Sequence, residues 1–354
     1  MTEEEKEIKI KGWNYDQTLK YLYREYYSLN PPLIIPKDIE RREFAFQPFE
    51  KQSYVRHLSF DNPKKLYDYL IKNTPRHAYY SIAIYDLPEA GSMEEKGWKG
   101  SDLLFDIDLD HEKDCIMQND IADDSCIEKG LKYAETIAHI INNYFGGSYQ
   151  IYFTGNRGYH VRGFCELCKQ LGKEERSEIA KFIMAQDLDI DMIFPKSSKG
   201  KKPALPTTKD PGWRGLIASF GIKEVSREDI NNAIQNIKVE IDSMVTQDPS
   251  RLTRIPGTLN GKSSLLVLPV CGEFKLGKWV SPFYGEVEVK AKMDLSNIKI
   301  LGSNIQFNKN EELSLPSQQA IYLATKGYLT IIGGKIVVRK NTGWWPIQGC
   351  NWNS

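Results

Sequence analysis

The sequence predicts an α+β fold, in which helices and strands are mixed along the chain without strict alternation. Short segments that alternate apolar and polar residues are typical of half-buried strands, and "FDIDLD" at 105–110 is the clearest of them. Other segments repeat apolar residues every three to four positions, as amphipathic helices do. The 354 residues, 41% of them hydrophobic, are enough for one large domain or two ordinary ones.

The first half of the chain contains two predicted helices and four predicted strands. Helices are predicted over 14–29 and 126–145 because apolar residues share one face, and two glycines follow the second helix. Residues 87–101 are polar and Gly-rich, which predicts a loop. Strands are predicted where apolar and polar residues alternate, in "REFAFQ", "SYVRHLSF", "DLLFDID" and "SYQIYFTG".

The second half follows the same mixed pattern. Helices are predicted over 173–190 and about 226–237, the latter with Ser226 as its N-terminal cap. Residues 195–212 are rich in Pro and Lys and predict a loop. Strands are predicted in "KVEID", "SLLVLPV" and "GEVEVKAKM", whereas the Trp-rich end "TGWWPIQGCNWNS" predicts no clear element.

Composition excludes several classes of protein. Lys+Arg and Asp+Glu number 47 each, so a nucleic-acid site would have to be a local basic patch. No apolar run approaches a membrane span, and the charged start "MTEEEKEIKIKG" is unlike a signal peptide. We therefore expect a soluble intracellular protein, in which the six cysteines favour metal binding over a disulfide framework.

The predicted strand at 103–108 carries two carboxylates on one face. Residues i and i+2 of a strand point the same way, so Asp106 and Asp108 share a face. Two such carboxylates repel each other unless a cation lies between them, and hard cations such as Mg²⁺ prefer oxygen ligands. Solvated acids on an exposed strand are the alternative, and the commoner case for an isolated Asp-x-Asp pair. The apolar neighbours instead indicate a central strand: Leu103, Leu104, Phe105 and Ile107.

A second motif, "YFTGNRGYH" at 152–160, leads from a predicted strand into a glycine turn. Gly155 and Gly158 allow positive φ. Thr154, Arg157 and His160 supply a hydroxyl, a guanidinium and an imidazole, and such a loop suits the oxygens of a phosphate. An ordinary glycine turn with a surface arginine explains this stretch equally well when it is considered alone.

A third motif, "VEIDSMVTQDPSRLTRIPGTLNGKS" at 239–263, places Asp242 on another predicted strand. Arg251, Arg254 and Lys262 follow around a Pro-Gly turn. A carboxylate is thus followed by cations within reach of a phosphate chain. A solvated strand end is the alternative for this motif by itself.

Together the three motifs resemble the catalytic small subunit of archaeo-eukaryotic DNA primases, of the archaeal type. That family has an Asp-x-Asp strand, then a Gly/Arg/Gly/His loop, then a third Asp followed by basic residues and a Pro-Gly turn. The segment "REFAFQPFEKQSYVRHLSF" also resembles the part of the family that precedes these motifs. The resemblance covers roughly residues 15–305, and the combination is specific although each motif alone is not.

The resemblance implies a role for each motif. Asp106, Asp108 and Asp242 would be the catalytic carboxylates and would hold two Mg²⁺ or Mn²⁺ ions about 3.5–4 Å apart. Arg56 and Glu43 match family positions near the nucleotide. The family often has His after the Pro-Gly turn, where Asn260 can hydrogen-bond a phosphate or sugar but cannot carry charge. The residues that would meet the incoming triphosphate are Thr154, Gly155, Arg157, His160 and Arg254.

The resemblance also implies a fold, an activity and a partner. The fold would be the primase (prim) fold over residues 1–330, a mixed sheet with an RNA-recognition-like catalytic module. It would include a zinc-binding insertion at 109–127 and a variable, mainly helical insertion near 170–235, followed by a tail of unknown role at 331–354. The activity would be synthesis of short primers on single-stranded DNA from nucleoside triphosphates, for replication. The partner would be a large primase subunit, and the heterodimer would lie at the nucleoid in the cytoplasm, or in the nucleus of a eukaryote.

The family places a zinc knuckle between the Asp-x-Asp strand and the following helix. In this chain that segment is "DHEKDCIMQNDIADDSCIEKG", and Zn²⁺ accepts His, Cys and Asp ligands. The second cysteine pair, Cys165 and Cys168, could join this site, form a redox pair or be buried thiols. The predicted ligands of one structural zinc are His111, Cys115, Asp123 and Cys126, with Asp124 as an alternative to Asp123.

Two other functions stay compatible with the sequence. One is a stand-alone primase-polymerase of plasmid, viral or repair type. The other is a non-enzymatic nucleic-acid-binding module with an RNA-recognition-like sheet, against which the three aspartates argue because acids facing phosphates give a pure binder no advantage. The basic run at 196–202 is predicted to be a solvated loop, or else a contact to template phosphates. His57, His77 and His139 show no partner pattern and are predicted to be structural.

Overall fold

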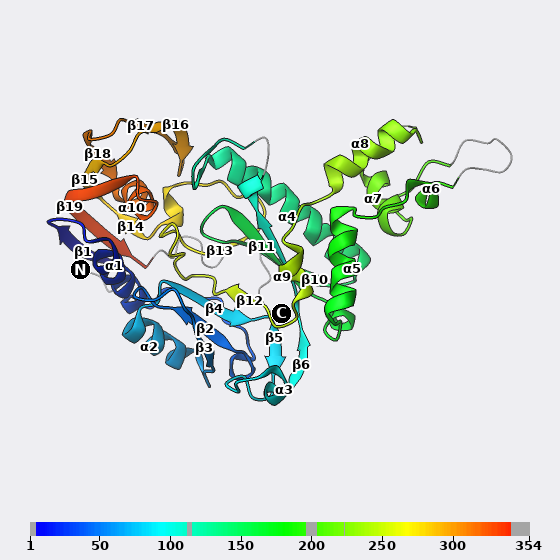
Figure 1. Cartoon of the computed structure of the whole chain (residues 1–354), viewed down its shortest axis with the longest axis horizontal. Helices are drawn as coiled ribbons and strands as arrows, with labels where there is room; N and C mark the ends of the chain where they lie inside the picture. Colours follow the sequence, from blue (N-terminus) through cyan, green and yellow to red (C-terminus); the bar gives the residue numbers. More distant parts are fainter. Residues whose placement is uncertain (1–4, 112–114, 196–203, 223, 341–354) are drawn as a thin grey trace.

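The computed structural model describes residues 5–111, 115–195, 204–222 and 224–340. Figure 1 shows a broad body, which contains three larger antiparallel sheets, and a helical arm that extends away from it. The predicted α+β class is confirmed, because helices and antiparallel sheets are mixed along the chain. Within the described ranges, no helix combines the length and the apolar character needed to cross a bilayer.

The central sheet contains the predicted Asp-x-Asp strand. Its order is β13 (Leu268–Val270), β10 (Ser148–Phe153), β11 (Gly158–Phe164) and β7 (Leu103–Asp108), with all pairs antiparallel. Helix α4 (Asp124–Tyr144) packs on one face of it (Figure 1). A Cβ on Gly163 would meet Leu103 of β7 and Ile141 of α4, so the odd-numbered residues of β7 face this helix. Asp106 and Asp108 therefore point to the opposite face.

A second sheet is built mostly from the N-terminal part of the chain. Its order is β12 (Leu252–Arg254), β4 (His77–Ser81), β2 (Phe44–Gln47) and β3 (Val55–Leu58). Helices α1 (Tyr15–Ser28) and α2 (Pro63–Asn73) pack against each other beside it. Helix α2 begins at Pro63 because the Asn62 side chain accepts the Lys65 N–H at 3.1 Å, and Pro has no N–H to lose in the first turn.

The third sheet joins the two ends of the described chain. Strand β1 (Glu5–Ile10) pairs with β19 (Leu329–Arg339), which also pairs with β15 (Glu286–Ala291) and β14 (Phe283–Tyr284). The boundary predicted at residue 330 falls inside β19, whose alternating apolar residues are buried in this sheet. The predicted tail beyond residue 340 lies outside the described residues. The remaining elements here are the edge strand β18 (Glu312–Pro316), the hairpin of β16 (Leu295–Ile300) and β17 (Ser303–Phe307), and helix α10 (Ser317–Thr325).

The helical arm contains α6 (Ile190–Ile193), α7 (Gly212–Phe220) and α8 (Arg227–Ile237), and α5 (Lys173–Met184) lies at its base (Figure 1). Helix α5 is shorter than predicted because Ala185 takes a left-handed conformation at its C-terminus, with φ 54°. The polar segment predicted as a loop at 87–101 contains two short elements. These two are α3 (Met93–Lys96) and β6 (Trp98–Ser101). The remaining short elements of the body are β5 (Ala83–Tyr85), β8 (Met117–Gln118), β9 (Ile121–Ala122) and α9 (Ser243–Gln247).

Candidate active site

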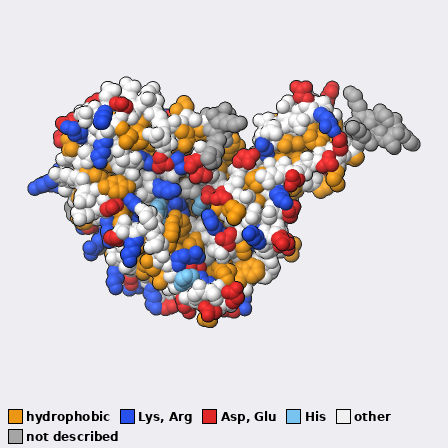
Figure 2. All heavy atoms as spheres, in the orientation of Figure 1, with side chains coloured by type: hydrophobic (Ala, Val, Ile, Leu, Met, Phe, Trp, Pro, Cys, Tyr) orange, Lys and Arg blue, Asp and Glu red, His pale blue; other side chains and the backbone are white. Residues whose placement is uncertain are grey.

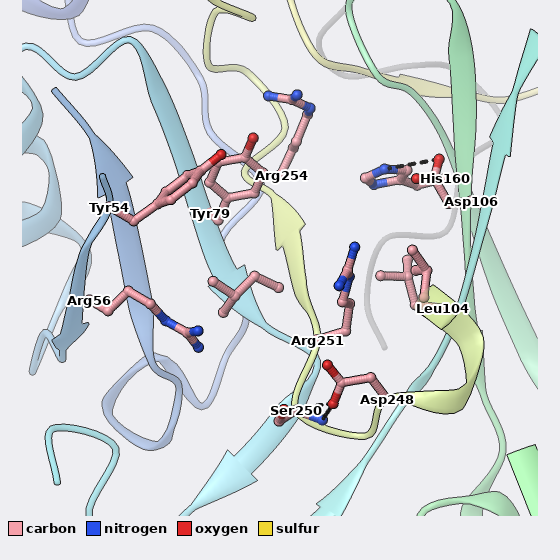
Figure 3. A pocket seen from close by; sticks show the side chains of 12 residues that line it. Tyr54, Arg56, Tyr79, Leu104, Asp106, His160, Asp248, Ser250, Arg251 and Arg254 are labelled. Carbon is pink, nitrogen blue, oxygen red and sulfur yellow. Dashed lines mark hydrogen bonds and ion pairs between the residues drawn. The ribbon is translucent and has the colours of Figure 1, made fainter. Parts of the chain in front are cut away.

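The two carboxylates of β7 lie on a face shared with His160 of the neighbouring strand. In the β7–β11 pair, Asp106 is opposite His160 and Asp108 is opposite Gly158. His160 Nε2 lies 3.5 Å from Asp106 Oδ1 (Figure 3). The alternation in "FDIDLD" thus places both acids on the side of the sheet away from α4.

Asp242 reaches the same place from a different segment. Its backbone N–H donates to the Asp106 carbonyl oxygen at 3.0 Å. Its Oδ1 accepts the Met244 N–H at 3.0 Å, so Asp242 caps helix α9. The strand predicted for "KVEID" is wrong, because this segment pairs with no sheet and ends at a helix N-terminus, where an Asp side chain satisfies a free amide.

The two acids of β7 resist ionisation in the free protein. Burial raises the pKa of Asp106 to about 6, and the Asp242 carboxylate adds to this while Arg254 opposes it. Burial likewise raises the pKa of Asp108 to about 6, with a further contribution from Asp110. A cation placed among these carboxylates would relieve both effects, so the cluster has the electrostatic character of a metal site.

A cavity of about 370 Å³ lies between the central and second sheets, beside this acidic cluster. Leu104, Asp106 and His160 form one wall (Figure 3). Figure 2 shows Lys, Arg and His side chains gathered around a hollow on this side of the body. The volume is that of a small-molecule site, and the juxtaposed charges suit an anion bound through cations. The opposite wall comprises Tyr54, Arg56, Tyr79, Asp248, Ser250, Arg251, Leu252 and Arg254.

Two arginines supply the positive charge of this cavity. Arg254 is opposite Tyr79 in the β12–β4 pair, and its guanidinium carbon lies 5.0 Å from the centre of the Tyr79 ring. The Arg251 side chain points into the cavity between the two walls (Figure 3). The positive charges of both arginines act on the acidic cluster, because each lowers the pKa of Asp106.

His160 is a neutral imidazole in this setting. Burial lowers its pKa to about 3, and the positive charges of Arg254 and Arg251 lower it further. Its Nδ1 lies 3.1 Å from the Thr253 hydroxyl. A contact between His160 and a phosphate would therefore be a hydrogen bond rather than an ion pair.

The predicted loop at 154–158 is tightly folded and buried. Gly155 has φ 77°, and the Thr154 N–H and hydroxyl both donate to the Gly158 carbonyl oxygen, at 3.0 and 3.1 Å. A Cβ on Gly158 would lie 2.0 Å from the Ile107 carbonyl oxygen. Glycine at 158 is thus required by the close approach of β7, and it keeps His160 in register with Asp106.

Arg157 is held by carboxylates next to the cavity, outside its lining residues. It forms ion pairs with Asp110 and Asp120, at 2.5 Å in each case. Its Nε is buried and has no hydrogen-bond partner within the described ranges. Lys326, at the end of α10, also pairs with Asp120 and donates to Asn156 at 2.8 Å. In the free protein, Asp110 and Asp120 therefore bind the Arg157 guanidinium, which was predicted to contact a triphosphate.

The less certain nucleotide contacts have partners within the protein. Asn260 Nδ2 donates to the Thr154 carbonyl oxygen at 2.8 Å, and its Oδ1 accepts the Lys262 N–H at 2.9 Å. Arg56 lines the cavity and pairs with buried Glu43 at 3.0 Å, and Glu43 also pairs with Lys96 at 2.5 Å. Asn260 thus ties two loops together, and Glu43 fixes the position of Arg56.

The predicted zinc ligands are arranged differently from the prediction. Cys115 and Cys126 form a disulfide, and so do Cys165 and Cys168. Asp123 caps α4 through the Ser125 N–H at 2.9 Å, and its other oxygen accepts the Lys299 N–H at 2.8 Å. The side chain of His111 lies outside the described residues. Cys165 and Cys168 do not join this site, because they are bonded to each other and not to Cys115 or Cys126.

Several cavity residues were not predicted. Tyr54, Tyr79, Asp248 and Ser250 line the cavity, although none of them was named as a candidate site residue. Tyr79 lies in "HAYYS" of β4, where alternation could have predicted a strand but not which element it would face. Asp248 and Ser250 form the local turn in which the Ser250 N–H donates to Asp248 Oδ1 at 2.8 Å. Their position depends on the pairing of β12 with β4, which no local pattern encodes.

Comparisons with known proteins identify the family. The family model described as DNA primase small subunit matches residues 105–271. A DNA primase small subunit of Aeropyrum pernix is 44% identical over 92% of this chain and 96% of its own length, and one of Saccharolobus solfataricus is 37% identical over 86% and 92%.

A solved structure, the polymerase domain of Mycobacterium tuberculosis Ligase D in complex with DNA, covers 72% of this chain and 80% of its own. Its TM-score of 0.39 and identity of 11% are too low to support an argument. The two primase relatives, by contrast, align with almost the whole of this chain. The chain therefore belongs to the family of archaeal DNA primase small subunits.

Proposed function

We propose that this chain is the catalytic subunit of a DNA primase, a template-directed nucleotidyltransferase that joins nucleoside triphosphates into short primers on single-stranded DNA for replication. The observation that carries the proposal is the position of Asp106 and Asp242 beside a cavity whose opposite wall holds Arg251 and Arg254. Carboxylates and arginines around one space support this proposal, because the former can bind metal ions and the latter phosphate. Relatives that align over most of the chain are named DNA primase small subunits, which supports the same activity.

The acidic cluster offers the ligands that hard divalent cations prefer. Asp106, Asp108 and Asp242 supply carboxylate oxygens, and the raised pKa of the first two reflects their burial and the neighbouring carboxylates. Within the described ranges, no three acidic, His or Cys side chains are already closed around one point, so metal binding would draw the acids together. Two Mg²⁺ or Mn²⁺ ions bound there would activate the 3′-hydroxyl of the primer and balance the charge of the leaving pyrophosphate.

The protein's own side chains bind and orient the nucleotide. Arg254 and Arg251 would donate to phosphate oxygens from the wall opposite the acids, and each such charge-assisted hydrogen bond is worth about 1.5–3 kcal/mol. His160 would add a hydrogen bond without adding charge. Arg157 would join them by exchanging the carboxylates of Asp110 and Asp120 for phosphate oxygens.

The finer features of the family are part of the proposal. The central sheet has four antiparallel strands with a helix on one face and a nucleotide-binding cavity on the other, which is how RNA-recognition modules use their sheets. Helices α5 to α8 correspond to the variable helical insertion. The template is single-stranded DNA, and the partner is a large primase subunit that supports initiation.

Zinc binding is a further part of the proposal. Cys115 and Cys126 have Cα atoms only 5.1 Å apart, so in the reduced protein they could supply two sulfur ligands at one point. Asp123 does not fit as the structure stands, because its oxygens cap α4 and accept the Lys299 amide. With His111, the reduced cysteines would bind about one Zn²⁺, and metal analysis of Cys115→Ser should show it lost. Stoichiometric zinc in that variant, or its absence from the reduced wild type, would contradict this ligand set.

The test of the activity is primer synthesis on single-stranded DNA with Mg²⁺ or Mn²⁺, by the purified chain alone and with a large subunit. Asp106→Asn, Asp108→Asn and Asp242→Asn should each abolish nucleotide addition, since the amide keeps the shape but loses metal affinity. Asn also caps helices well, so Asp242→Asn should leave α9 and the melting temperature nearly unchanged. Wild-type turnover in any variant removes that residue from the site, and DNA binding without synthesis by either preparation would favour a non-enzymatic binder.

A further inference from the structure

His77 is a buried histidine that contacts Arg254, a residue of the cavity wall, without lining the cavity itself. It is the first residue of β4, and only 4% of its surface is exposed. Its Nδ1 lies 2.8 Å from Arg254 Nη1, although the two residues are 177 positions apart in the sequence. The same Nδ1 accepts the Gly261 backbone N–H at 3.3 Å. His77 Nδ1 thus accepts hydrogen bonds both from Arg254, which lines the cavity, and from the backbone of the turn that follows Arg254 in the chain.

These two contacts define the protonation of the ring. A guanidinium and a backbone amide can only donate, so Nδ1 must be an acceptor and the proton of the neutral ring lies on Nε2. Burial lowers the pKa of His77 far below its usual range, and the charges of Arg254, Arg76 and Lys262 act in the same direction. His77 is therefore an uncharged acceptor that a protonated imidazole could not replace.

The turn held by His77 belongs to the phosphate site as well. Gly261 lies so close to Arg76, the residue before β4, that a Cβ there would be 2.1 Å from Arg76 Cγ. Its neighbours are Asn260, which is hydrogen-bonded to the Thr154 carbonyl oxygen at 2.8 Å, and the exposed cation Lys262. The imidazole therefore connects Arg254 with the loop that begins at Thr154, through a single acceptor atom.

Arg254 is supported from two sides by β4. Residues 77 and 79 share a face of this strand, and the Tyr79 ring packs against the guanidinium carbon at 5.0 Å while His77 accepts from one of its nitrogens. Arg254 also lines the cavity (Figure 3). Fixing a long side chain in this way removes rotamer freedom that would otherwise be lost when the ligand binds.

We propose that His77 is a positioning residue for nucleotide binding: its unprotonated Nδ1 orients Arg254 and the 260–262 turn toward the phosphates. This inference rests on the proposed role of Arg254 as a phosphate contact. A histidine that merely filled space in the core would need no acceptor at Nδ1, and a side chain of similar size would replace it.

The matched pair His77→Asn and His77→Leu tests this directly. Asn and Leu have nearly the same shape, but the Asn amide oxygen can occupy the place of Nδ1 and accept from Arg254, whereas Leu cannot. We expect His77→Leu to raise the nucleotide KM on the order of tenfold, as for a lost hydrogen bond to a charged group, with a smaller effect on kcat. His77→Asn should keep KM within about threefold of the wild type, and single-stranded DNA affinity should be unchanged in both. Equal KM values for the Leu and Asn variants would overturn the inference, whether both are normal or both are raised.

A double-mutant cycle separates this inference from the role of Arg254. If His77 acts through Arg254, His77→Leu should have little further effect on KM in an Arg254→Ala background. Full additivity of the two effects would refute the positioning role. A normal KM in Arg254→Ala alone would instead refute the proposed phosphate contact. Melting temperatures of all four proteins show whether any variant has lost its fold, and a misfolded His77→Leu leaves the comparison of His77→Asn and His77→Gln, of which only Asn places an acceptor at Nδ1.

Discussion

Neutralising Asp110 should make the enzyme bind nucleotide more tightly. In the free protein Arg157 is paired with Asp110 and Asp120, so a triphosphate must displace these carboxylates before it can use the guanidinium. The Asp110 side chain is 34% exposed, and an ion pair that is open to water in this way is worth about 1 kcal/mol or less. Because a tenfold change in affinity corresponds to 1.4 kcal/mol, Asp110→Asn should lower the nucleotide KM by up to about fivefold.

The assay is steady-state primer extension at saturating template, with KM and kcat measured separately. Asp110→Glu keeps the charge and serves as the matched control, so its KM should stay near that of the wild type. Loss of Asp110 also removes a charge that raises the pKa of Asp108, which should make Asp108 ionise more readily and not impair metal binding. A raised KM, or a collapse of kcat in Asp110→Asn with Asp110→Glu active, would show that Asp110 assists catalysis and does not compete with substrate.

Two further predictions follow from the geometry. In metal-free protein the Asp106 and Asp108 carboxyls have a pKa of about 6, above the unfolded value of about 3.9, so they bind more protons when folded. Their contribution to stability is fully present below about pH 4 and is lost as pH rises through 6. Mg²⁺ should therefore raise the melting temperature more at pH 7.5 than at pH 5. Equal shifts at the two pH values would contradict metal binding by these carboxylates. Gly158→Ala should lower both stability and activity, because its Cβ would lie 2.0 Å from the Ile107 carbonyl oxygen. Gly12→Ala is the control, because Gly12 has open space around it and no positive φ, and this variant should keep activity. A fully active Gly158→Ala would refute the close approach.

The sequence was most informative where a pattern is local. The pairing of Asp106 with Asp108 on one face follows from strand alternation, and the turn at Gly155 follows from its glycine. The helix pattern at 126–145 was recognisable because its apolar face packs on the central sheet, although the cap at Asp123 starts the helix at Asp124. In each case the information lies within a few residues of the feature.

The sequence was least informative where distant segments meet. His77 was predicted to be structural, because nothing near it in the chain suggests Arg254 as its partner. The segment that ends at Asp242 was predicted to be a strand because its apolar and polar residues alternate. In the structure Asp242 instead caps the N-terminus of α9. Arg157 has the residue type expected of a phosphate contact, yet its partners in the free protein, Asp110 and Asp120, come from positions that no motif links to it.

The position of β12 has a consequence for how the protein is made. Strand β4 lies between β2 and β12, so during synthesis the edge of β4 that β12 covers stays unpaired until residue 254 has left the ribosome. Exposed strand edges of this kind promote association between nascent chains, and pairing over so long a stretch of chain is slow. The same late step brings Arg254 onto Tyr79 and His77. Nucleotide binding and burial of the vulnerable edge should therefore appear together during refolding, after most of the remaining structure has formed.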